Sequence, residues 1–265
     1  MKVEINIRIT WRKTMIYITG DCHRRFDRFD SNIFPEQNDM NENDYVIICG
    51  DFGGIWNEDY EDVEESFILD QLNNKPFTTL FVDGNHENFD RLYEYPVKKW
   101  HGGKVHKIRP KVLHLCRGEI FDIDGASFFA FGGAKSHDID DGVLDLEDPD
   151  FIEKRKELDR RWALYRINHI SWWKEELPTE KEMDNGRKNL LKHNNEVDYI
   201  ITHCCSSSTQ AILGRGGYKT DILTDYFEDI KQNVKFKKWF FGHYHDNVNV
   251  SADEILIYEQ IIRIK

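Results

Sequence analysis

The chain has 265 residues, of which 40% are hydrophobic, so it can supply a core and does not have a disordered composition. Its formal net charge of −12 argues against a protein that wraps long nucleic acid, because such proteins usually carry a basic stripe. No run reaches the roughly 18 apolar residues that a membrane helix needs, and the N-terminus lacks the apolar stretch of a signal peptide.

Residues 1–14 precede the first motif and admit two interpretations. The segment VEINIRI alternates polar and apolar residues, as a half-buried edge strand does. Alternatively, Met15 is the natural start and residues 1–14 are an N-terminal extension. We expect residues 1–265 to form a single domain, near the upper size for one core, with residues 143–195 as a helical insertion packed on or near the site.

Five short apolar runs each end in a polar residue of a type that binds metal. Runs of this length bounded by Gly and Asp predict buried strands. Ligands of open α/β sheets gather beyond the carboxyl ends of the strands, so these ends should bring two Asp, one Asn and five His to one edge. The runs are MIYIT, YVIIC, TLFVD, YIIT and KWFF, and they lead into GDCH (20–23), GD (50–51), GNHE (84–87), His203 and GHYH (242–245).

The segments between the motifs predict further elements. Residues 60–72 should form the crossover helix after the second strand, and SFFAF at 127–131 should form another buried strand. Residues 221–232 predict an amphipathic helix, and ILIYEQIIRI predicts two closing strands. The expected buried faces are Val63, Phe67, Ile68 and Leu72 in the first helix, and Ile222, Leu223, Tyr226, Phe227 and Ile230 in the second.

Residues 143–195 are rich in Glu, Lys and Arg and predict two or more helices. The second should span Thr179 to His193, because Thr179 is a good cap and Glu182 follows three residues later. The three tryptophans of this segment should pack between helix and sheet; they are Trp162, Trp172 and Trp173.

The ligand types at the strand ends fit a pair of metal ions. The two oxygens of Asp51 can bridge two ions, and Asn85 adds a neutral oxygen without cancelling positive charge. Mixed nitrogen and oxygen ligands without thiolate suit Mn first, and also Fe, Zn, Co or Ni, whereas Ca and Mg fit poorly. Two divalent ions about 3.5–4 Å apart can activate a bridging water and clamp a phosphoryl group.

The ordered set of motifs resembles the calcineurin-like metallophosphoesterase superfamily, especially its small bacterial and phage members. The resemblance implies an α/β fold, a four-layer α/β/β/α sandwich with two central mixed β-sheets. It also implies that Asp51 and His86 are catalytic, His86 as the general acid or as a stabiliser of the transition state. The first metal would be held by Asp21, His23, Asp51 and His245, and the second by Asp51, Asn85, His203 and His243.

The chain departs from the family's protein phosphatases after its second motif. Those enzymes carry an Asp and an Arg there, whereas this chain has Phe52-Gly53-Gly54. Protein phosphatase activity is therefore not expected, and a group other than Gly54 must orient His86.

Four further side chains are candidates for contact with substrate. Arg24 replaces a Gly of the family pattern and either contacts substrate or is solvated. Lys135 and His137 follow the SFFAF strand and either line the cleft or have a structural role. Arg215, in the loop GRGG, either reaches an anionic substrate or serves only as a turn residue. The remaining histidines are interpreted as structural; they are His101, His106, His114, His169 and His193.

The five cysteines point to a reducing compartment, because their odd number and spacing fit neither a disulfide framework nor a paired-cysteine zinc site. We expect a cytoplasmic protein whose thiols pack as small hydrophobes, with metal binding by two of them as the alternative. The cysteines are Cys22, Cys49, Cys116, Cys204 and Cys205.

These observations predict a hydrolase of phosphoric esters. Its substrate would be a phosphomonoester or a small phosphodiester such as a nucleotide, attacked in line by a metal-bridging hydroxide. The alternatives are a nuclease of the same superfamily acting on short nucleic acid, and a non-catalytic binding scaffold. The scaffold is disfavoured because every expected ligand position is filled.

Overall fold

The apolar runs form strands that are buried on both faces, and this produces the layers of the fold. The structure is a computed structural model that describes residues 12–57 and 60–265, so the predicted VEINIRI strand lies outside the described residues. In β1 (Ile16–Thr19), Ile16 and Ile18 face the core between two sheets, whereas Tyr17 faces a helical layer. Side chains alternate across a strand, so one apolar run serves two layers.

The first sheet brings three of the motifs to one edge. Within the described residues it has seven strands in the order β15-β1-β2-β3-β6-β5-β4. The parallel register pairs Thr19 with Ile48 and Ile48 with Phe81, so three strands end level with one another. The other strands are β2 (Tyr45–Ile48), β3 (Thr78–Phe81), β4 (Val97–Trp100), β5 (Gly103–Arg109), β6 (Val112–Leu115) and β15 (Ile262–Arg263).

The second sheet supplies the remaining motifs. Its order in the described part of the chain is β13-β14-β12-β11-β8-β7, with β8, β11, β12 and β14 parallel. The strands β11 and β12 end immediately before His203 and Gly242. The bounds are β7 (Glu119–Ile123), β8 (Ala126–Phe131), β11 (Tyr199–Thr202), β12 (Lys238–Phe241), β13 (Val248–Asn249) and β14 (Glu254–Leu256).

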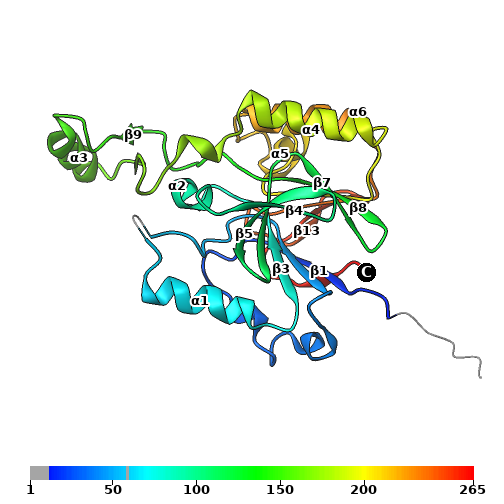
Figure 1. The fold of residues 1–265 in the computed structure, drawn as a ribbon. Helices are drawn as coiled ribbons and strands as arrows, with labels where there is room; N and C mark the ends of the chain where they lie inside the picture. The colour runs from blue at the N-terminus through cyan, green and yellow to red at the C-terminus, as the bar shows by residue number, and fades with distance from the viewer. Residues whose placement is uncertain (1–11, 58–59) are drawn as a thin grey trace, which may run out of the picture.

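Helices cover the outer face of each sheet, which confirms the predicted four-layer α/β/β/α sandwich. The first sheet packs against α1 (Val63–Asn73), and the second packs against α4 (Glu180–Lys192) and α6 (Ile222–Asn233), as Figure 1 shows. Shorter helices lie at α2 (Phe89–Leu92) and α5 (Ser207–Leu213), and short 3₁₀ turns lie at Asp27–Phe29, Pro35–Asp39 and Lys174–Glu176.

The cap predicted for α4 is confirmed. Glu182 N–H donates to Thr179 Oγ1 at 3.3 Å, and Thr179 N–H donates to Glu182 Oε2 at 2.7 Å. This reciprocal pair satisfies two amide groups that would otherwise lack partners at the start of the helix. The helix therefore begins where the sequence predicts.

The buried face predicted for α1 is wrong at Val63 and Phe67 and confirmed at Leu72. Val63 and Phe67 are exposed, whereas Leu69 and the carboxylate of Glu65 are buried. The reason is an ion pair within the core, because Glu65 accepts hydrogen bonds from Arg91 of α2. The helix is turned to satisfy this pair, which apolar spacing does not reveal.

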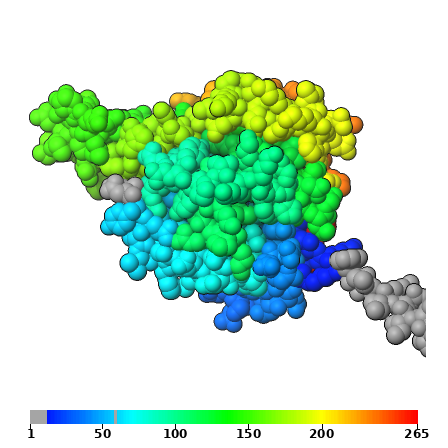
Figure 2. All heavy atoms as spheres, viewed as in Figure 1, coloured from blue at the N-terminus to red at the C-terminus, as the bar shows by residue number. Residues whose placement is uncertain are grey.

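The segment that carries α3 (Phe151–Arg160) projects from the body of the molecule, as Figures 1 and 2 show. A short parallel pair, β9 (Val143–Leu144) and β10 (Arg166–Ile167), joins its two ends. The packing predicted for Trp162 is wrong, since this residue is 92% exposed, whereas Trp173 is buried as predicted. Among the described helices, none combines the length and apolar character needed to cross a membrane.

A buried ion pair supports the loop that follows β3. Arg117 Nε donates to Asp83 Oδ2 at 2.9 Å, and both side chains are almost fully buried. Burial alone would raise the pKa of Asp83, but Arg117 and His114 outweigh it and hold that pKa below its usual range. The carboxylate therefore stays charged directly before Gly84.

Removal of one side chain of the buried Asp83–Arg117 ion pair should strongly destabilise the fold. We expect Arg117→Met to lower the free energy of unfolding by about 3–5 kcal/mol, because it leaves the buried Asp83 charge without its guanidinium partner and with only the hydrogen bond from His114. Urea denaturation at neutral pH measures this. Arg155→Met, which removes a solvent-exposed partner of Asp159 in α3, is the control and should cost under about 1 kcal/mol. Equal effects of the two substitutions would contradict the prediction.

Candidate metal centre

The ligand loops begin where the strands end, and their backbone is strained. Residues other than glycine rarely adopt positive φ, and such residues gather at functional sites. Here four predicted ligands have positive φ; they are His23 (45°), Asp51 (45°), His243 (71°) and His245 (50°). All four residues lie in the loops that follow β1, β2 and β12, at the shared edge of the strands.

The glycines of the motifs permit close approach between loops. A Cβ atom on Gly84 would lie 2.0 Å from Asp51 Oδ1, and one on Gly242 would lie 2.0 Å from Asp21 Oδ1. In the same places, the amides of His86 and His243 donate to these carboxylates at 2.9 and 3.0 Å. The GNHE and GHYH motifs thus each position, by a backbone hydrogen bond, the carboxylate of another motif.

Gly84→Ala should therefore weaken metal binding as well as lower the stability of the fold. The added methyl group must displace the Asp51 carboxylate, so we expect loss of bound metal and about 1–3 kcal/mol of stability. Metal content after dialysis and thermal unfolding check this. Gly125→Ala is the control for metal binding: a Cβ there meets nothing within 4 Å, so it should lower stability through its positive φ of 74° and leave metal content unchanged. Retention of metal by Gly84→Ala would contradict the prediction.

The first predicted ligand set converges. Asp21, His23, Asp51 and His245 each place one ligand atom within 4.8 Å of the others. His245 Nε2 lies 2.9 Å from His23 Nε2 and 3.2 Å from Asp21 Oδ2. His23 Nε2 lies 3.6 Å from Asp51 Oδ2. Two imidazoles and two carboxylates thus face one small volume.

The second predicted set meets the first at Asp51. His203 Nε2 lies 3.2 Å from Asp51 Oδ1 and 3.3 Å from Asn85 Oδ1. The ring of His243 lies 5.0 Å from that of His203. The two oxygens of Asp51 therefore face different groups, Oδ2 toward His23 and Oδ1 toward His203.

Hydrogen bonds outside the motifs orient these ligands. His203 Nδ1 lies 2.8 Å from the carbonyl oxygen of Cys49 and donates to it, which leaves Nε2 free as a ligand. Asn85 Nδ2 donates to Ser136 Oγ at 3.3 Å, and Ser136 Oγ donates to Glu176 Oε2 at 2.6 Å. Sequence reasoning missed Ser136 and Glu176, because neither lies in a motif.

The electrostatics of the site favour bound cations. Asp21 and Asp51 are each only 1% exposed, so their negative charges lie in a region of low dielectric. Burial would lower the pKa of His203, but Asp51 and Asp21 outweigh it and raise that pKa. Burial lowers the pKa of His243. Two buried carboxylates beside several imidazoles are a donor set that suits divalent ions with mixed nitrogen and oxygen ligands.

His86 lies beside the first ligand set. Its ring is 5.0 Å from that of His23 and 5.8 Å from that of Trp56, and burial lowers its pKa. The nearby charges that act on it include Asp138 and Arg166. These two form a fork, in which Arg166 Nε donates to Asp138 Oδ1 at 2.9 Å and Nη2 donates to Oδ2 at 2.6 Å.

The candidates for substrate contact are not all brought together. Lys135 and His137 line a cavity of about 460 Å³, and His137 Nε2 lies 2.8 Å from His243 Nε2, so this cavity adjoins the ligands. Arg24 instead forms a 3.5 Å ion pair with Glu64 and lines a separate cavity. Arg215 is exposed in the turn after α5. Substrate contact by these four residues stays a prediction.

Comparison with known proteins agrees with this geometry. The family model described as calcineurin-like phosphoesterase matches residues 14–247. The chain is 26% identical to the lariat debranching enzyme of Danio rerio over 248 residues, which cover 87% of this chain and 40% of that protein. It is 26% identical to lariat debranching enzyme A of Xenopus laevis and 25% identical to the Homo sapiens lariat debranching enzyme, each over 46% of this chain and 24% of the relative.

The chain thus spans less than half the length of these relatives, and the family match covers most of the chain itself. The match includes all seven side chains that the sequence predicts as metal ligands; they are Asp21, His23, Asp51, Asn85, His203, His243 and His245. The chain belongs to the calcineurin-like phosphoesterases, hydrolases of phosphoester bonds that use divalent metal ions.

Proposed function

We propose that the chain is a dinuclear metal-dependent phosphodiesterase that acts on nucleotides or short nucleic acid. The observation that carries the proposal is the position of Asp51, whose two oxygens face two separate sets of ligands. Mn²⁺ is the first candidate for both ions, because the donors are imidazoles and oxygens without thiolate. The first set is Asp21, His23, Asp51 and His245, and the second is Asp51, Asn85, His203 and His243.

The residues of the chain position the substrate and handle one proton. When bound, the two ions would neutralise phosphoryl oxygens and activate the attacking water. His86 is half-buried beside the first ligand set and donates a proton to the leaving oxygen. Asp138, fixed by Arg166, is the candidate to orient His86, a role that Gly54 cannot perform.

A diester is favoured over a monoester by the cavity next to His137 and by the relatives. The cavity is lined by Lys135, Lys219 and Tyr218, which supply two cations and an aromatic face, and also by the carboxylates of Asp140 and Asp221. Lysines attract phosphate, and an aromatic side chain can stack on a base. The cavity can therefore hold the nucleoside on one side of a phosphodiester bond.

The first test compares bis(p-nitrophenyl) phosphate with p-nitrophenyl phosphate. The protein is stripped of metal and reloaded with Mn²⁺, and we expect restored turnover that is faster on the diester. A faster monoester would overturn the diester preference. Absence of turnover on both, with metal demonstrably bound, would overturn a general phosphodiesterase and favour either a narrow natural substrate or a non-catalytic binding scaffold.

Hydrolysis of branched RNA is a second candidate, because the relatives that match are lariat debranching enzymes. A lariat RNA and a linear RNA of the same sequence separate this candidate from general nuclease activity. Selective cleavage of the lariat supports debranching, and equal cleavage supports a nuclease. Because the net charge is −12, we expect binding to depend on the branch rather than on RNA length.

Two broader expectations remain proposals. A cytoplasmic location is supported by the cysteines, all free, of which four are buried. Folding as a single domain over residues 1–265 is supported by contacts from the 143–195 segment back to the centre, through Glu176 and Arg166. Limited proteolysis that yielded a separately stable 143–195 fragment would contradict the second proposal.

A further inference from the structure

A second group of metal-binding side chains lies on one face of the β5–β6 pair, apart from the ligand loops. His106 in β5 is directly opposite His114 in β6, and Cys116 follows two residues after His114. Residues two apart in extended chain share a face, so all three side chains meet. Each offers one ligand atom, and these atoms lie within 4.8 Å of one another.

The orientation of His114 leaves its second nitrogen toward the group. His114 Nε2 donates to Asp83 Oδ1 at 2.9 Å, so Nδ1 faces His106 Nδ1, also at 2.9 Å. Asp83 is buried and held by Arg117. Histidines that bind metals commonly donate their other nitrogen to a carboxylate in this way, which sets the tautomer and the direction of the ring.

The separations are close to those of a tetrahedral site. Bond lengths of about 2.0–2.1 Å to nitrogen and 2.3 Å to sulfur imply about 3.3 Å between two nitrogens and about 3.6 Å between nitrogen and sulfur. Cys116 Sγ lies 3.6 Å from His106 Nδ1, and the two imidazole nitrogens lie 2.9 Å apart. A proton shared by the imidazoles accounts for the shorter separation, and only a few tenths of an ångström separate this arrangement from a metal site.

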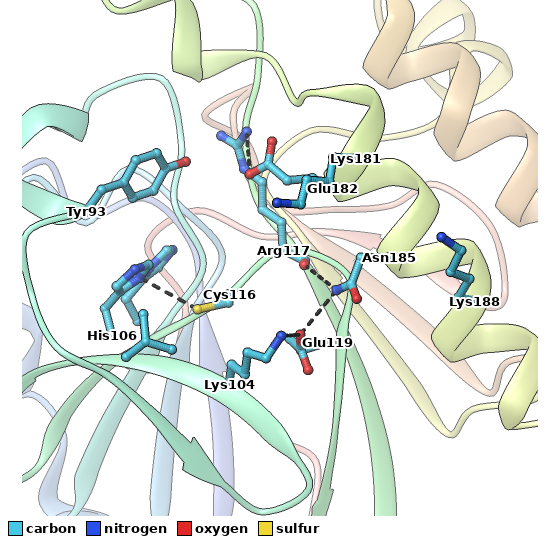
Figure 3. A pocket seen from close by; sticks show the side chains of 12 residues that line it. Tyr93, Lys104, His106, Cys116, Arg117, Glu119, Lys181, Glu182, Asn185 and Lys188 are labelled. Atoms are coloured by element: carbon cyan, nitrogen blue, oxygen red, sulfur yellow. Dashed lines mark hydrogen bonds and ion pairs between the residues drawn. The ribbon is translucent and has the colours of Figure 1, made fainter.

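A cavity of about 430 Å³ gives access to the group. It is lined on one side by Tyr93, His106 and Cys116, and on the other by residues of α4, as Figure 3 shows. Lys181 and Lys188 lie at the α4 side and Lys104 at the strand side. Glu119 and Glu182 also line the cavity, and Lys104 Nζ lies 3.5 Å from Glu119 Oε1, so a fourth coordination position would open into a space of mixed charge that suits a water ligand.

We propose that His106, His114 and Cys116 bind a transition-metal ion of the Zn²⁺ class. Two imidazoles and one thiolate suit Zn²⁺ or Co²⁺, and three protein ligands leave one position open. Binding releases the Cys116 thiol proton to solvent, and the proton between the imidazoles moves to the far nitrogen of His106. Because Asp83 directly precedes Gly84, this ion would also brace the loop that carries Asn85 and His86.

Titration with Co²⁺ tests the proposal without any measurement of turnover. A thiolate bound to Co²⁺ gives a charge-transfer band in the near ultraviolet, and the proposed dinuclear centre holds no sulfur ligand. We expect a saturable band in the unmodified protein, its loss in Cys116→Ser, and affinity at least about tenfold weaker in His106→Asn. His193→Asn, at the exposed end of α4, is the matched control and should retain the band.

Two outcomes would overturn the site. One is Co²⁺ bound with no charge-transfer band, and the other is a band that survives in Cys116→Ser. Circular dichroism establishes that each variant folds, and His106→Asn alone decides the matter if Cys116→Ser does not fold. A protein without phosphodiesterase activity would still show the band, so the result is independent of the proposed function.

Discussion

Asp51→Asn should reduce kcat for bis(p-nitrophenyl) phosphate by on the order of 10³-fold while the fold stays intact. The substitution keeps the size of the side chain and removes one of the two oxygens that face the ligand sets. Oδ1 accepts the amide hydrogen of His86, so the oxygen of the new amide should remain there. Its NH₂ group would then point toward His23, where a ligand is needed.

This arrangement predicts an unequal loss of metal. The first ion, on the side of His23 and His245, should be lost before the second, because only that side exchanges an oxygen for an NH₂ group. Metal content per chain and turnover should be measured on the same preparation. Asp229→Asn is the control, since that carboxylate is exposed on α6. Wild-type turnover with two ions bound would contradict a bridging role for Asp51.

The approach of the candidate ligands to one another was predictable from the sequence because these residues are local features of strand ends. An apolar run forms a buried strand, and the residues that follow it lie in a loop beyond the edge of the sheet. Parallel pairing then brings residues as distant as Asp21 and His243 together, and the amide of His243 donates to the Asp21 carboxylate at 3.0 Å. Only the side-by-side order of the strands had to be assumed.

The sequence did not predict polar pairs between distant segments. Glu87 ends the GNHE motif, and its side chain accepts from the amides of Phe52 and Gly53 at 2.7 and 3.2 Å, a contact that no local pattern indicates. It is fully buried, and burial raises its pKa well above the usual value. Carboxylates that support a loop 35 residues away follow no periodic pattern.

The face of α1 and the histidines of β5–β6 were missed for a related reason. An apolar stripe is a guide to burial only where no buried charge competes, and Glu65 competes in α1. His106 and His114 belong to no motif, and their meeting depends on the antiparallel register of two strands. Spacing along the chain carries no information on such register.

His86→Asn should lower kcat by about 10²–10⁴-fold for a diester with an alkoxide leaving group. An alkoxide needs a proton to leave, and the ring of His86 is placed beside the first ligand set to supply it. A p-nitrophenolate leaves without a proton, so the same variant should lose much less on bis(p-nitrophenyl) phosphate. The measurement is the ratio of kcat values for the two substrates in each protein.

The ratio separates the two roles predicted for His86. A general acid gives a loss that grows with the basicity of the leaving group. A side chain that stabilises charge on the phosphoryl oxygens gives a similar loss on both substrates. His193→Asn should leave both rates unchanged, and retained metal content in His86→Asn would assign the loss to His86 itself. If His86→Asn left both rates at the wild-type level, both roles would be wrong, and the position beside His23 would reflect packing alone.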